Sequence, residues 1–393
     1  MKFLKGLALT LLSFLLFLSL FIFSLAFLLN STILNPDFIT SELDRLEVAP
    51  LAEEIISEQI PAEELPEELK AALINTITKL EPVVKEQVSA ATYSVYDYLL
   101  GKRESPDLAH TLRNTFLSSD FVTSLVDELD IASLAGEFIS EQFTEGIPEE
   151  MEFMVGAIDD ILIELEPWIK EQISAAADPV FDYLLGESQS LHIVISLEPV
   201  KEILEDTLKE AFLESPPPEF ADLPQSTLDQ YFDEFFGEFA EMLPATFEVD
   251  ESVVGTEIPA EIAAAIGEAE KGLEQGREVI SYFQLGYNLL IVFMLLLILG
   301  IIFIHRQIKG ATRGLGITFL TFGALELIGI FVAKYFAEIQ LAQLPPIPSP
   351  LQTWLPQFLN NCLAPLQMLS IGLIVGGVAL LIVSFVYRPR QPV

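Results

Sequence analysis

Residues 7–29 read LALTLLSFLLFLSLFIFSLAFLL, and this almost unbroken apolar stretch decides the fold class of the chain. At 1.5 Å per residue, a helix of this length crosses a hydrocarbon core of about 30 Å. A cleaved signal peptide is the alternative, because Ser24 and Ala26 suit a cleavage site. The apolar run is longer than the roughly 7–15 residues of a signal core. We therefore predict an uncleaved N-terminal transmembrane anchor, residues 1–34.

Three more apolar segments near the C-terminus predict further spans, at Phe283–Ile304, Leu315–Phe336 and Leu366–Tyr387. Basic residues concentrate in short cytoplasmic loops. Three basic clusters occur here, at residues 2–5, 305–313 and 388–390. They lie on one side of the membrane only if the number of spans is even. The sequence thus predicts a cell-membrane protein with four spans and both termini in the cytoplasm. Residues 35–282 and a proline-rich loop, residues 337–365, would lie outside.

The charge of the chain is separated along the sequence in the same way. Acidic residues outnumber Lys and Arg 58 to 20, and all but Glu326 and Glu338 lie within residues 37–278. That interval has 12 basic residues and a net charge of −44. Nucleic acid would be repelled by such a domain, so nucleic-acid binding is not expected. The charge predicts a solvated surface, and binding of divalent cations or of an envelope protein is the alternative.

The acidic region contains a tandem repeat. Three segments recur: DFITS at 37–41 as DFVTS at 120–124, LEPVVKEQ at 80–87 as LEPWIKEQ at 165–172, and DYLLG at 97–101 as DYLLG at 182–186. The spacing is 83 residues at the start and 85 at the end, so the second copy has a two-residue insertion. We predict repeat 1 at residues 35–117 and repeat 2 at residues 118–215.

Each copy is predicted to be helical, with two short helices followed by two longer ones. Pro82 and Pro167 suit the first turn of a helix, and Gly101 and Gly186 suit a helix C-terminus. Five aromatic residues are predicted to make core or inter-repeat contacts, or alternatively to line a ligand groove: Trp168, Phe181, Tyr183, Tyr96 and Tyr98.

The remainder of the acidic region predicts a strand pair and a stalk. Leu191–Leu197 has the alternating, β-branched pattern of a strand, and Thr246–Val249 is its expected antiparallel partner. A helix is expected from Glu198 to about Glu214. Residues 216–282 are predicted to be a degenerate third repeat and a helical stalk, continuous from about Ala260 to Ile304. The fold class is therefore mainly α: a four-transmembrane-helix bundle plus a helical tandem-repeat extracytoplasmic domain with one short strand pair.

The repeat resembles acidic units found between transmembrane helices in uncharacterised prokaryotic envelope membrane proteins. The tryptophan, the Lys-Glu-Gln run, the tyrosine-leucine pair and the glycine carry the resemblance, which covers roughly Asn35 to Ser215. It implies an extracytoplasmic helical domain. No known activity is attached to the family, so the resemblance assigns no functional residues.

Glu326 lies near the middle of the third predicted span. It is the residue of that span most indicative of function. A charged side chain there costs roughly 2.5–3.5 kcal/mol or more and is by default a functional candidate. Proton or cation coupling is one interpretation, and a neutral acid that hydrogen-bonds across helices is the other. In the fourth span Gly372, Gly376 and Gly377 predict close helix packing, within the bundle or alternatively in a dimer. Gly376 is expected beside Glu326.

No catalytic, metal-binding or cofactor-binding pattern is present. The three histidines are far apart, and no metalloprotease, Walker A or dinucleotide fingerprint occurs. The only cysteine is Cys362, so no intramolecular disulfide can form. We therefore expect a non-enzymatic binding or scaffold role in the cell envelope, without a cofactor. The alternative is a small proton- or cation-coupled transporter or channel component that uses Glu326.

Overall fold

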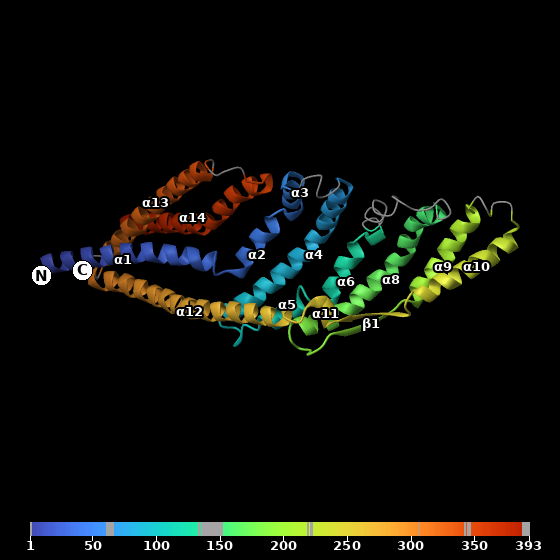
Figure 1. Cartoon of the computed structure of the whole chain (residues 1–393). Helices are drawn as coiled ribbons and strands as arrows, with labels where there is room; N and C mark the ends of the chain where they lie inside the picture. The colour runs from blue at the N-terminus through green and yellow to red at the C-terminus, as the bar shows by residue number, and fades with distance from the viewer. Residues whose placement is uncertain are drawn as a thin grey trace. The chain divides into compact units, whose positions relative to one another are not determined.

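The computed structural model describes residues 2–59, 67–132, 135, 152–217, 220, 223–305, 307–341, 343 and 347–386. It divides into two compact units. Unit 1 comprises Met1–Leu51, Thr92–Pro106 and Leu273–Val393, and unit 2 comprises Ala52–Ala91 and Asp107–Gly272. Figure 1 traces the helices and strands along the chain.

Four helices are long and apolar enough to cross a membrane: α1 (Lys2–Ser31), α12 (Ile258–His305), α13 (Ile308–Leu341) and α14 (Ser349–Val386). This confirms the predicted number of spans. The continuous helix expected from about Ala260 to Ile304 is also confirmed, because α12 runs unbroken for 48 residues. The chain thus has the features of a multi-pass membrane protein with a helical bundle.

The apolar core of unit 1 joins α1, α12 and α13. Leu16, Ile301 and Phe322 are buried at its centre, and Phe17 meets Phe322 edge to face with ring centroids 5.3 Å apart. Large apolar side chains on the outer faces of the same helices stay exposed, for example Leu289 on α12. An apolar exterior around an apolar core is what a lipid solvent permits and water does not.

α13 and α14 are antiparallel neighbours (Figure 1). They pack closely through small residues. A Cβ added at Gly316 would meet the Gly377 carbonyl oxygen at 2.9 Å, and one at Gly323 would meet the Ser370 carbonyl oxygen at 2.8 Å. Such close backbone approach is possible only where side chains are absent or small. Of the predicted packing glycines only Gly377 takes part, because a Cβ at Gly372 or Gly376 would have no atom within 4 Å.

The predicted loop at residues 337–365 is wrong in its extent. α13 continues to Leu341, and α14 already begins at Ser349, so that Pro356 and Pro365 lie inside a helix. Proline normally interrupts a helix because it removes one hydrogen bond and clashes with the preceding turn. In membrane helices, neighbouring helices and side chains satisfy the freed backbone groups, which makes an internal proline tolerable.

The first segment of the acidic region forms three helices: α2 (Pro36–Arg45), α3 (Val48–Gln59) and α4 (Glu67–Leu99). The corresponding later segment contains α6 (Ser119–Glu128) and α8 (Glu152–Leu184), with α5 (Leu108–Asn114) between the two segments. α2 and α6 each have 10 residues, and α4 and α8 each have 33. Gly101 (φ 79°) and Gly186 (φ 75°) follow α4 and α8 in the left-handed region, as predicted for C-terminal glycines.

The two longer helices expected in each copy are a single helix, so the assignment of Pro82 and Pro167 to first turns is wrong. Both prolines lie inside their helices. An ion pair one turn apart spans each proline, Glu81–Lys85 at 2.6 Å and Glu166–Lys170 at 2.7 Å. These pairs support the helix across the missing hydrogen bond.

The last part of unit 2 contains the predicted strand pair and a helical hairpin. β1 (His192–Ser196) pairs antiparallel with β2 (Thr246–Asp250), and α11 (Glu251–Val254) follows. α9 (Glu198–Glu214) matches its predicted bounds, whereas α10 (Gln225–Met242) was not predicted. Phe212, Phe232 and Phe236 form the buried core that α9 and α10 share with α8.

Candidate functional site

Two carboxylates, each with a buried and unpartnered oxygen, mark the candidate functional positions of unit 1. Within the part of the chain that the structure describes, Glu42 Oε2 and Glu326 Oε1 are the buried side-chain oxygens without a hydrogen-bond partner. Leaving a buried acceptor unsatisfied costs about 1–3 kcal/mol, and more for a charged group. Each oxygen is therefore a place where a proton, a cation or a ligand donor would be stabilised.

Glu42 is held in place by the local structure of α2. The side chain of Asn35 accepts a hydrogen bond from the Asp37 amide, and Pro36 occupies the first turn, so α2 begins at a defined residue. Glu42 follows in the second turn and is only 2% exposed. Arg45 lies one turn later and donates from Nη1 to Glu42 Oε1.

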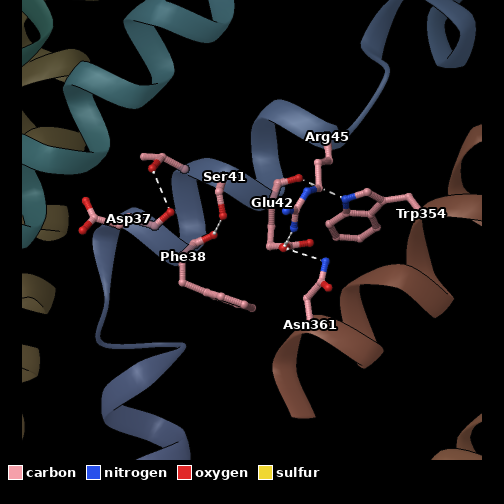
Figure 2. A network of polar contacts seen from close by, with 8 residues as sticks. Asp37, Phe38, Ser41, Glu42, Arg45, Trp354 and Asn361 are labelled. Atoms are coloured by element: carbon pink, nitrogen blue, oxygen red, sulfur yellow. Dashed lines mark hydrogen bonds and ion pairs between the residues drawn. The ribbon is translucent and has the colours of Figure 1, made fainter. Parts of the chain in front are cut away.

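One face of α14 completes the site around Glu42, as Figure 2 shows. Trp354 Nε1 donates to the Glu42 carbonyl oxygen at 3.0 Å, and Asn361 Nδ2 donates to Glu42 Oε1 at 3.0 Å. Phe358 stacks on Trp354 with ring centroids 4.9 Å apart. The three α14 residues are spaced four and three apart, so they fall on one helix face.

An open surface cavity of about 400 Å³ adjoins this network. One part of its wall is polar and includes Ser41, Glu42, Arg45 and Asn361. The other part is apolar and comes from membrane-type helices, with Phe27 on α1 and with Ala364, Pro365, Met368 and Leu369 on α14. A cavity of this size and mixed lining falls within the range that binds small molecules. It suits an amphipathic ligand.

Glu326, the residue that the sequence singled out, lies at a second cavity between α1, α13 and α14. Its Oε2 accepts a hydrogen bond from the fully buried Ser370 hydroxyl at 2.9 Å. The cavity has a volume of about 280 Å³, and Ser24 shares its mostly apolar wall. The prediction that Gly376 lies beside Glu326 is wrong. The antiparallel register of α13 and α14 places Ser370 beside Glu326 instead.

The five aromatic residues proposed as contacts or as a groove lining are divided between the two units, with Tyr96 and Tyr98 in unit 1 and Trp168, Phe181 and Tyr183 in unit 2. Tyr98 and Tyr183 are buried. The Arg277 guanidinium lies over the Tyr98 ring, 4.7 Å from its centroid. The Tyr96 hydroxyl donates to the Ile33 carbonyl oxygen at 2.6 Å, and burial raises the pKa of Tyr96. Trp168 and Phe181 are half-buried on α8.

A third hollow is an open groove of about 740 Å³ between α6 and α8 in unit 2. Its lining residues are Thr123, Asp127, Ile163, Glu166, Pro167, Lys170, Glu171, Ser174 and Ala175. The Lys170 ammonium donates to the Asp127 carbonyl oxygen at 3.0 Å, and Glu166 Oε2 accepts from the Ala132 amide at 3.4 Å. These two bonds tie the end of α6 and the chain that follows it to α8, and they fix one wall of the groove.

The residue types of this groove recur in the first segment of the acidic region. Eight of the nine lining residues are identical at the corresponding positions, namely Thr40, Asp44, Glu81, Pro82, Lys85, Glu86, Ser89 and Ala90. Only Ile163 differs, with Thr78 in its place. Over the helices as a whole only about half of the positions match. The groove-lining residues are thus more similar to their counterparts in the first segment than the helices that carry them are.

Sequence reasoning missed Glu42, although comparison of the two similar segments offered a signal that could have found it. Glu42 stands where the second segment has Leu125, and Arg45 stands where it has Glu128. A half-buried leucine in one segment and a buried carboxylate at the same position of the other indicate a departure that packing alone does not require. Its hydrogen-bond partner Asn361 lay in the segment predicted to be a loop.

The described residues include no group of three or more His, Cys, Asp and Glu side chains placed to hold a metal ion. Comparison with known proteins places the chain in no recognised group: no family model, no curated protein and no solved structure matches it.

Proposed function

We propose that this is a multi-pass membrane protein of the cell envelope that presents residues 35–282 outside the cytoplasm as an acidic tandem-repeat binding domain. It would recruit a protein partner through the groove between α6 and α8. The observation that carries the proposal is the near identity of the groove-lining residues with their counterparts in the first segment of the acidic region. The net charge of −44 over residues 37–278 favours a partner with a basic surface.

Several further features support this topology and this architecture. The three basic clusters favour cytoplasmic termini. The matched lengths of α2 and α6, and of α4 and α8, agree with a duplicated helical unit. The resemblance to uncharacterised prokaryotic envelope proteins also favours an extracytoplasmic helical domain.

If a partner binds in the groove, the yield of photo-crosslinking is expected to differ sharply between two neighbouring residues of α8. A photo-crosslinking amino acid at Ser174, which lines the groove, is expected to give one discrete adduct in the native membrane. The same group at Ile173 is expected to give a several-fold lower yield of adduct, because Ile173 lies outside the groove lining. Exposure does not explain the difference, since Ile173 is 40% exposed. Gel shift and peptide identification measure both yields.

The Glu171→Lys substitution in the groove wall tests whether the partner is attracted by the negative charge of the groove. It is expected to lower the Ser174 adduct several-fold, because it places a positive charge where a basic partner would dock. Equal yields at Ser174 and Ile173, or a yield that Glu171→Lys leaves unchanged, would contradict the proposed function.

A second candidate function, proton- or cation-coupled transport, is favoured by the cavity at Glu326. An intramembrane carboxylate with one unpartnered oxygen beside a cavity of about 280 Å³ has both a site for a cation or proton and space around it. The hydroxyls of Ser24 and Ser370 supply further polar atoms.

Flux through reconstituted liposomes tests this second candidate. If the protein transports protons or cations, Glu326→Gln is expected to lower the flux at least about tenfold, as loss of a charged site does. Glu338→Gln, an exposed acid on the same helix, is expected to leave it unchanged. The flux is read with a pH-sensitive dye inside the liposomes under an imposed potential. Flux equal to that of empty liposomes, or equal in wild type and Glu326→Gln, would exclude this function.

A further inference from the structure

The structure holds an amphipathic cavity at Glu42 that the proposed binding domain does not explain. Glu42 is 2% exposed, yet its Oε2 has no hydrogen-bond partner within the described part of the chain. Its other oxygen, Oε1, is already bound by Arg45 and Asn361. The free oxygen can accept but not donate while the carboxyl is ionised. What fits it is a ligand with N–H donors, above all a cation.

Arg45 adds a second requirement on the ligand. Its guanidinium carries five N–H donors, and Nη1 is directed to Glu42. The Arg45 side chain is 51% exposed and lines the same cavity. A guanidinium in this position binds a phosphate group through its remaining donors. Glu42 and Arg45 therefore suit a ligand that carries an ammonium and a phosphate close together.

The apolar wall supplies the third requirement. Phe27 belongs to α1, while Met368 and Leu369 belong to α14, and both helices are candidate membrane spans. Apolar chains inside a bilayer have direct access to such a wall. A free phosphorylated amine would leave this wall uncovered, whereas a phospholipid would cover it with its acyl chains.

We propose that the cavity between α1, α2 and α14 binds the headgroup of an aminophospholipid of the phosphatidylethanolamine class. Its ammonium donates to Glu42 Oε2, its phosphate pairs with Arg45, and its acyl chains lie along Phe27, Met368 and Leu369. Asn361 and Trp354 are positioning residues, since both donate hydrogen bonds to Glu42. The site depends on neither the groove between α6 and α8 nor Glu326.

Native mass spectrometry of the delipidated full-length protein in detergent tests the proposal. Three dioleoyl lipids serve as probes: phosphatidylethanolamine, phosphatidylcholine, which has no N–H donor, and phosphatidylglycerol, which has no ammonium. We expect wild type to bind one phosphatidylethanolamine about tenfold more tightly than either other lipid, because one charge-assisted hydrogen bond separates them. Equal affinity for the three lipids in wild type would overturn the proposal without any variant.

Matched variants assign the selectivity to the two residues. Glu42→Gln keeps the shape of the side chain and is expected to abolish the preference for phosphatidylethanolamine. Glu47→Gln removes the same charge from an exposed neighbour outside the cavity and is expected to keep the preference. Arg45→Gln is expected to weaken the binding of all three lipids to the same extent, because all three carry a phosphate. A Glu42→Gln variant that folds and retains the preference would show that Glu42 is only structural.

Discussion

Gly377→Leu is expected to separate α13 from α14, whereas Gly376→Leu at the adjacent position is expected to leave their packing intact. A Cβ at Gly377 would lie 2.7 Å from the Leu320 amide nitrogen and 2.9 Å from the Gly316 carbonyl oxygen. Both are backbone atoms, which cannot move aside unless the helices part. Inserting atoms into a well-packed interior costs about 1–3 kcal/mol or more. The loss is measured as the unfolding midpoint of the full-length protein in detergent.

Gly376→Leu is the control because a Cβ there has no atom within 4 Å. It also tests the alternative that Gly372 and Gly376 mediate a dimer. In that case, Gly376→Leu would change the oligomeric state, measured by light scattering, without lowering the unfolding midpoint. Equal destabilisation by both substitutions would refute the close packing of α13 against α14 at Gly377.

The membrane helices could be predicted because long apolar runs leave little choice of structure. A stretch such as residues 7–29 must satisfy its backbone internally, and a helix does so. The bounds of α9 followed from Glu198 and Pro199 at its start and from the proline run after its end. The pairing of β1 with β2 followed from the need of an isolated strand for a partner.

Proline was the main source of error, because its effect depends on tertiary context. Local rules place Pro82 and Pro167 at helix starts and Pro356 in a loop. In the structure all three lie inside helices, where ion pairs or neighbouring helices support the interrupted turn. The same error shortened α14, and it led to the wrong partner for Glu326.

The two candidate sites of unit 1 differ in how visible they were from the sequence. Glu326 stands alone in an apolar span, so its cost in the membrane identifies it at once. Glu42 is one of many acidic residues, and its burial depends on α14 packing over α2. No local sequence pattern predicts the contact between α14 and α2.

Phe232→Ala is expected to lower the free energy of unfolding of unit 2 by about 3–5 kcal/mol, as deletion of a buried aromatic ring does. Phe232 is 1% exposed, and its ring stacks on Phe236 with centroids 5.7 Å apart. It also contacts Phe212 of α9. Removal leaves a cavity between α9 and α10 that the remaining rings cannot fill.

Trp168 of α8 reports this loss in a Trp354→Phe background, because the chain has only these two tryptophans. Urea titration of Trp168 fluorescence in the full-length protein measures the midpoint. Phe235→Ala is the matched control, since Phe235 lies on the same helix but is 39% exposed and is expected to cost less than about 1 kcal/mol. A similar cost for both phenylalanines would mean that α10 does not pack against α9.

Since α9 in turn contacts α8, which carries the groove, Phe232→Ala should also reduce crosslinking from Ser174 under conditions where unit 2 partly unfolds.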